Sequence, residues 1–308
     1  MESSLPNPLP RWNVFSRMLD NPVIAKELKG RMRGRQGFTL LTVYLMLISF
    51  FITLVYLTLY SEGNTIGTPG YLQVVGKAIF STVVLLELLM VSFIGPALTS
   101  GAISSEREHQ TFDLLHISLL SAPSLVFGKL GSAIIYLLLL IFSAIPVESL
   151  AFFLGGVGIA EMVISTLMLV VTAVFFCSLG LFFSSFSKRT LTSTVLTYGS
   201  NLLSFIFFLV MLFMLSMFSS SVFYSSNAFD DVLNLVIWFL FSTNAFFAAV
   251  VSEVNLIENQ SIFTSTNGLW GSTPFPLPSP WIIYVTFYSF FTILLILLSI
   301  YFVSRTER

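Results

Sequence analysis

Residues 162–186 read MVISTLMLVVTAVFFCSLGLFFSSF, a stretch without a single charged side chain. A helix needs about 20 apolar residues to cross the hydrocarbon layer of a bilayer, so this stretch is long enough to span a membrane. The whole chain has the same character, because 56% of its 308 residues are hydrophobic and only 9% are charged. Soluble domains carry about 25% charged residues. This chain therefore cannot cover a globular surface with water-binding groups, and its solvent must be largely lipid.

Seven apolar segments of this kind follow one another along the chain. They are residues 38–60, 78–99, 130–150, 162–186, 191–218, 232–251 and 281–303. Lysine and arginine concentrate before the first segment, between the second and third, between the fourth and fifth, and after the last. By the positive-inside rule these connections are cytoplasmic, and so are both chain ends. We therefore predict a multi-pass protein of the cell (cytoplasmic) membrane.

The number of full crossings must be even if both ends lie on one side. Segment 232–251 contains Asn234, Ser242 and Asn244. It lies within residues 190–302, which contain neither Lys nor Arg. We interpret it as a re-entrant or interfacial helix pair on the outer side, a geometry tolerated only where protein buries it. The alternative is that this segment crosses fully and another does not.

The predicted fold class is therefore all-α and polytopic, with six transmembrane helices. The expected organisation is a cytoplasmic N-terminal segment, one transmembrane domain containing an outer re-entrant region, and a cytoplasmic tail, at residues 1–37, 38–303 (outer region 219–280) and 304–308. Within the fourth segment, Gly180 and Ser184 form a small-xxx-small pair suited to close helix packing.

Residues 21–37, NPVIAKELKGRMRGRQG, have the pattern of a basic amphipathic helix. Asn21 can cap the helix with Pro22 at its first position. Apolar side chains, including Ile24 and Leu28, share one face. The basic side chains of the opposite face are Lys26, Lys29 and Arg33. We expect this helix to lie in the cytoplasmic interface, with its basic side chains near anionic lipid headgroups.

Residues 101–121, GAISSEREHQTFDLLHISLLS, crowd charges together in a chain that has few. Ser105 and Glu108 have the spacing of a capping box, which predicts a helix over residues 104–119. We interpret its polar face as a docking surface for a soluble partner; a merely solvated face is the alternative. A metal site is disfavoured because His109 and His116 would lie about 10.5 Å apart along the helix axis.

These motifs resemble those of the permease subunits of ABC-2 type transporters. NPVIAKELKGRMRGRQGF precedes the first span, GPALTSGAIS closes the second, SEREHQTFDLL follows it, and FGKLGS opens the third. The resemblance covers essentially the whole chain, and its most specific part is residues 95–131. His109 and Gln110 depart from the pattern, since small or basic residues are commoner there, and His116 is not a feature of it.

The resemblance implies that the helix after the second span is a coupling helix, which fits a cleft on a separate nucleotide-binding ATPase subunit. ATP-driven closure would then rock a pair of permeases, either two copies of this chain or this chain with a homologous permease. Phe112 would be the apolar anchor of the docking surface. The full docking set carried over from the pattern is Glu106, Arg107, Glu108, Thr111, Phe112 and Asp113.

The sequence itself contains no complete ATPase motif. The stretch GYLQVVGKA at residues 70–78 has one residue too many between its glycines for a phosphate-binding loop, and Ala78 stands where Ser or Thr must bind magnesium. We therefore expect no enzyme activity in this chain, and no cofactor, metal or nucleic acid as a ligand. A structural or assembly subunit of a larger membrane complex is the alternative function.

One ionisable residue, Glu87, falls near the middle of the second span. An acidic group at membrane depth is costly and is by default a functional hypothesis. Two interpretations stay open: a hydrogen bond to another helix, which we favour, or contact with a substrate. An intramembrane enzyme would need further Glu, His or Asp groups at this depth.

Overall fold

The computed structural model describes residues 22–32, 35–61, 70–110, 122–218, 228–257, 262–268 and 271–306. Its helices are α2 (Pro22–Met32), α3 (Arg35–Ser61), α4 (Tyr71–Thr99), α5 (Ser104–Glu108), α7 (Ala122–Phe153), α8 (Ile159–Phe186), α9 (Thr190–Phe218), α10 (Ala228–Ser242), α11 (Ala245–Ile257) and α12 (Pro280–Thr306). Two strands, β1 (Thr264–Gly268) and β2 (Gly271–Pro278), complete the described part. Six of these helices, α3, α4, α7, α8, α9 and α12, are long and apolar enough to cross a membrane. A polytopic, predominantly helical membrane protein was the prediction, and this much of it is confirmed.

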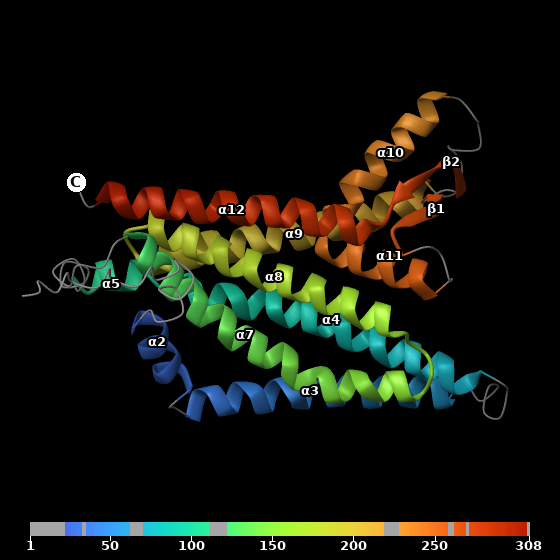
Figure 1. Cartoon of the computed structure of the whole chain (residues 1–308), viewed down its shortest axis with the longest axis horizontal. Coiled ribbons are helices and arrows are strands. Elements are labelled where there is room, and N and C mark those ends of the chain that lie inside the picture. Colours follow the sequence, from blue (N-terminus) through green and yellow to red (C-terminus); the bar gives the residue numbers. More distant parts are fainter. Residues whose placement is uncertain are drawn as a thin grey trace, which may run out of the picture.

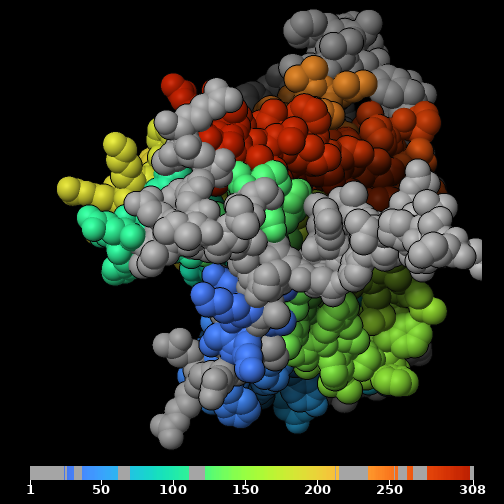
Figure 2. Space-filling model, turned by 60° about the vertical axis from the view of Figure 1, so that its left-hand side comes forward, coloured from blue at the N-terminus to red at the C-terminus, as the bar shows by residue number. Residues whose placement is uncertain are grey.

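The six long helices run alternately up and down in one bundle (Figure 1). The end that carries α2, α5 and the last turn of α12 is called the junction end below. The opposite end carries α10, α11 and the two strands, and is called the hairpin end. Figure 2 turns the junction end toward the viewer, with α2 in blue below and α12 in red above. Both described ends of the chain thus lie at the same end of the bundle.

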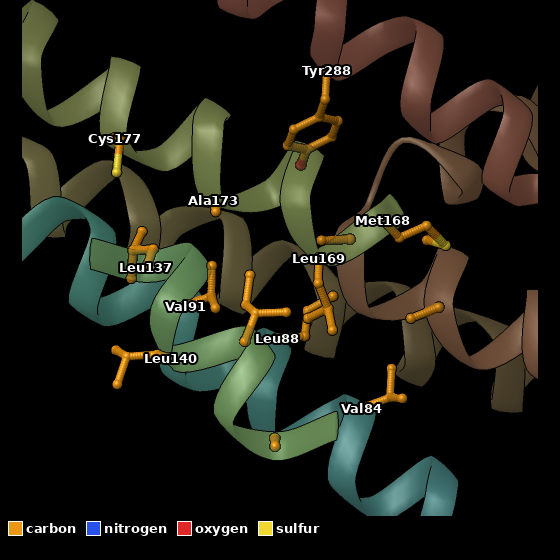
Figure 3. Close-up of a cluster of buried hydrophobic side chains, with 14 of the residues drawn as sticks. Val84, Leu88, Val91, Leu137, Leu140, Met168, Leu169, Ala173, Cys177 and Tyr288 are labelled. Atoms are coloured by element: carbon orange, nitrogen blue, oxygen red, sulfur yellow. The ribbon is translucent and has the colours of Figure 1, made fainter. Parts of the chain in front are cut away.

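Helix α8 lies at the centre of the packing, in contact with α4, α7, α9, α11 and α12. Figure 3 shows side chains of α4, α7 and α8, among them Leu88, Leu137 and Leu169, pointing toward one another. All three side chains are fully buried. By contrast, most side chains of α3 and α9 are open to the surroundings, and these helices form the periphery of the bundle.

Two close approaches depend on glycine. A Cβ added at Gly180 on α8 would collide with the Thr99 side chain on α4, so the predicted close packing at Gly180 is confirmed. At the hairpin end, a Cβ added at Gly156 would lie 2.6 Å from the backbone nitrogen of Lys77. Only glycine allows the backbones to come this near without a shift.

Hydropathy located the long helices but not all of their ends. Helix α4 begins at Tyr71 and α7 at Ala122, several residues before the apolar segments that predicted them. Apolar character marks the part of a helix that can sit in hydrocarbon, whereas backbone hydrogen bonding continues into the polar turns beyond it.

The helix predicted over residues 104–119 ends at Glu108 within the described part. Gln110 adopts a left-handed conformation with φ 57°, which stops a right-handed helix. The predicted capping box is also wrong, because Ile103 precedes the first helical residue and no side chain caps the helix at that position. Ser105 lies inside α5 instead.

A β-hairpin lies within the predicted outer region 219–280, for which no strand was predicted. β1 and β2 pair antiparallel, with Thr264 opposite Pro278 and Gly268 opposite Gly271. The prolines at positions 274, 276 and 278 explain the outcome, because proline breaks a helix interior yet is tolerated along one edge of a strand. Trp238 of α10 donates from Nε1 to the Pro278 carbonyl at 3.0 Å and so ties α10 to the hairpin.

Segment 232–251 is broken into two helices, as predicted. Residues 235–242 of α10 and 245–252 of α11 lie at 109° to one another. Asn244 stabilises the break, since its Oδ1 accepts hydrogen bonds from the backbone N–H groups of Phe246 and Phe247. Its Nδ2 donates to the Ser204 carbonyl on α9 at 3.2 Å.

Candidate functional site

The short helix α5 is held by its backbone against the end of α8. Ser184 Oγ accepts hydrogen bonds from the backbone N–H groups of Ile103 and Ser104, at 2.8 and 2.9 Å. The first N–H groups of a helix have no partner within it, so a hydroxyl from a neighbouring helix satisfies them here. Ser184, the second member of the small-xxx-small pair, thus fixes where α5 begins.

A buried ammonium group joins three helices at the junction end. Lys129 on α7, with a side chain only 4% exposed, forms ion pairs with Glu106 of α5 at 2.7 Å and with Glu27 of α2 at 3.1 Å. These three residues are called the Lys129 junction below. A buried charge is stable only when it is paired and hydrogen-bonded. The two carboxylates meet this need, and they couple α2 and α5 to the start of α7.

The other two charges of α5 also bind within the chain. Arg107 donates from Nη1 to the Ser185 carbonyl at 2.8 Å, in the last turn of α8. A cation is favoured there because a helix ends in unpaired carbonyl groups that carry partial negative charge. Glu108 accepts a hydrogen bond from the backbone N–H of Thr190 at 3.0 Å, at the beginning of α9, where a carboxylate is favoured for the opposite reason.

The predicted docking residues thus separate into two groups. Glu106, Arg107 and Glu108 hold α5 to the bundle, and of these only Glu108 is mostly exposed. Thr111, Phe112 and Asp113 lie outside the described residues, as does His116. Sequence reasoning missed Lys129 as the partner of Glu106. A signal was present, since a lysine beside an apolar span needs a carboxylate nearby.

Helix α2 presents two different faces. Ile24, Glu27 and Leu28 are half-buried, and a Cβ added at Gly131 of α7 would lie 3.2 Å from Ile24 Cδ1. This face therefore packs against α7. Lys26 and Lys29, predicted to lie at the membrane interface, are exposed on the other side of the helix. Arg33, the third predicted interface residue, lies outside the described residues.

Glu87 is completely buried on α4. The hydroxyl of Tyr44 on α3 donates to its Oε1 at 2.9 Å, whereas its Oε2 has no hydrogen-bond partner among the described residues. Glu148 on α7, also buried, is close enough to act on Glu87 electrostatically. The bond to Tyr44 makes Glu87 a link between α3 and α4. Neither Tyr44 nor Glu148 was identified from the sequence, because their proximity depends on how the helices pack.

Among the described side chains, no three His, Cys, Asp or Glu residues converge as a metal site would require. No protein-family model matches the chain, and no curated protein matches its sequence.

Proposed function

We propose that this chain is the permease subunit of an ABC-2 type transporter, which forms the substrate pathway as a dimer and is driven by a separate ATPase subunit. The observation that carries the proposal is the position and bonding of α5. This helix follows the second long helix, stands at the end of the bundle where basic residues concentrate, and is bonded to α7, α8 and α9.

Such bonding suits a helix that a partner protein outside the membrane displaces. A displacement of α5 acts on α8 through Ser184 and Ser185, on α9 through Thr190, and on α7 through Lys129. α8 in turn contacts most of the bundle. Coupling between distant sites travels through packed and hydrogen-bonded contacts of this kind. A partner that moves α5 would therefore move the core.

The proposed orientation places the junction end in the cytoplasm, where an ATPase has access to ATP. The segment of residues 111–119 that follows α5 would meet the ATPase, with Phe112 as its apolar anchor and Thr111 and Asp113 beside it. The bent pair α10–α11 would lie on the outer side as a re-entrant element, packed against α12. α2 would lie in the cytoplasmic interface.

The first experiment is purification of the chain from its native membranes in mild detergent, followed by mass spectrometry of the proteins bound in stoichiometric amount. We expect a nucleotide-binding ATPase. Recovery of other enzyme subunits without an ATPase would contradict the transporter and support a structural or assembly subunit.

Phe112→Ala tests the docking surface directly. The few hot-spot residues of an interface cost about 2 kcal/mol or more when truncated. If Phe112 is such an anchor, Phe112→Ala should bind the ATPase roughly 30-fold more weakly, with unchanged membrane insertion. Phe112→Leu is the matched control, because it keeps an apolar anchor and should retain most of the affinity. The measurement is a binding titration of the purified partner on the reconstituted chain. Equal affinity for Phe112→Ala and the parent would exclude Phe112 as the anchor.

A further inference from the structure

The two faces of α2 contact different surroundings. Ile24, Glu27 and Leu28 follow the i, i+3, i+4 spacing of one helix face, and this face meets α7 through Gly131 and Lys129. Lys26 and Lys29 lie on the opposite side and are exposed. One side of this helix is therefore bonded to the bundle, and the other offers positive charge to whatever lies beside it.

Lys129 connects α2 to α5 through a single ammonium group. Glu27 and Glu106 come from different elements, and both bind the same Nζ atom, at 3.1 and 2.7 Å. Their side chains remain about a quarter exposed, at 27% and 24%, whereas that of Lys129 is almost fully buried. Any movement that withdraws Glu27 removes one of the two carboxylates that compensate the buried charge of Lys129. The ion pair with Glu106 must then compensate that charge.

We propose that α2 senses anionic lipid and reports it to α5 through the Lys129 junction. Anionic headgroups beside α2 attract Lys26 and Lys29, because basic residues next to a membrane surface are drawn to negatively charged lipids. These lysines lie on the face turned away from α7, so the attraction draws α2 outward and lengthens the Glu27–Lys129 contact. Lipid composition thereby affects the position of α5, the helix that the proposed function assigns to ATPase docking. The meaning of that effect rests on the proposed function, whereas the movement itself does not.

The test uses the full-length chain in nanodiscs of phosphatidylcholine, with or without phosphatidylglycerol. Spin labels are attached to cysteines that replace Gly30 on α2 and His109 after α5, and the distance between them is measured by pulsed electron paramagnetic resonance. Both positions are exposed, and a Cβ at Gly30 meets nothing within 4 Å. The native Cys177 is buried and does not compete for the label. No ATPase is present, so the result is independent of whether the chain is a permease.

We expect phosphatidylglycerol to shift the distance distribution to longer values in the parent chain. Lys26→Gln with Lys29→Gln should remove this shift and keep the phosphatidylcholine distribution in both lipids. Glu27→Gln, which leaves the Lys129–Glu106 pair in place, should give the longer distances even in phosphatidylcholine. The proposal is overturned by a parent distribution that ignores phosphatidylglycerol, by a shift that survives in the double lysine variant, or by parent-like distances in Glu27→Gln.

Discussion

Gly180 and Thr99 show how a missing side chain sets the distance between two helices. The Thr99 hydroxyl donates to the Gly95 carbonyl within α4, and its side chain occupies the space that a Cβ on residue 180 would need. Ser100 N would also lie only 3.2 Å from that Cβ. α4 and α8 can therefore approach this closely only while residue 180 is glycine.

Gly180→Ala should destabilise the protein by about 1–3 kcal/mol, the usual cost of inserting a carbon into a well-packed contact. The control is Gly199→Ala on α9, where an added Cβ meets nothing within 4 Å. That variant should unfold at the parent temperature or slightly above it, because alanine favours helix. The measurement is thermal unfolding of both purified variants in the same detergent. Identical unfolding temperatures for the two variants would contradict the close approach at Gly180.

The role of a residue could be predicted from the sequence where it depends on neighbours within the same helix. It could not be predicted where it depends on how separate helices pack. Gly180 and Ser184 are identifiable as a small-residue pair because their spacing lies within one helix. Tyr44 and Glu87 are separated by 43 positions in the chain, and no local sequence pattern predicts their hydrogen bond. The same limit applies to Glu27 and Lys129.

At the scale of elements, the bend between α10 and α11 depends on both ends of one amide side chain. Oδ1 of Asn244 caps α11, and Nδ2 holds the break to the Ser204 carbonyl on α9. Hydropathy predicts one apolar segment here, since both helices are apolar. The polar residues within it indicated a break, but the angle follows from the cap and the tether.

Substitutions at Asn244 should separate its two roles. Asn244→Ala loses the cap and the tether, and loss of an N-cap costs about 0.5–2 kcal/mol. Asn244→Asp keeps the cap but loses the donor to Ser204. We expect hydrogen exchange in the first turn of α11 to rise strongly in the alanine variant and little in the aspartate variant. Thr243→Ala, at the adjacent position, is the control. Equal exchange in the alanine and control variants would show that Asn244 does not cap α11.

At the scale of the whole molecule, the alternating helices bring both described ends to the junction end. The sequence predicted this from the distribution of lysine and arginine, because charge asymmetry acts over the entire chain. Which end faces the cytoplasm stays a prediction of that rule. Hydropathy was equally sufficient for the six long helices, whereas the hairpin and the early end of α5 depend on proline and on a single left-handed residue.

Cysteine labelling tests the orientation. A membrane-impermeant maleimide should label Gly158→Cys, at the hairpin end, in intact cells. Lys29→Cys and Arg305→Cys, at the junction end, should react only after the membrane is permeabilised. All three positions are exposed, and the buried native cysteine provides the unlabelled background. The reverse pattern would place the junction end outside the cell and would rule out docking to a cytoplasmic ATPase.

The Lys129 junction also has a consequence for biosynthesis. Both carboxylates precede Lys129 in the chain, so they have left the ribosome before the lysine enters the membrane region. A charged side chain beside an apolar span is costly until it is paired. Its partners are thus already made when α7 inserts. Arg107 is in the opposite situation, because its acceptor at Ser185 is made 78 residues later. The contacts among α2, α5 and α7 can therefore form early in synthesis. The hydrogen bonds of α5 to α8 and α9 form only after those helices have emerged from the ribosome.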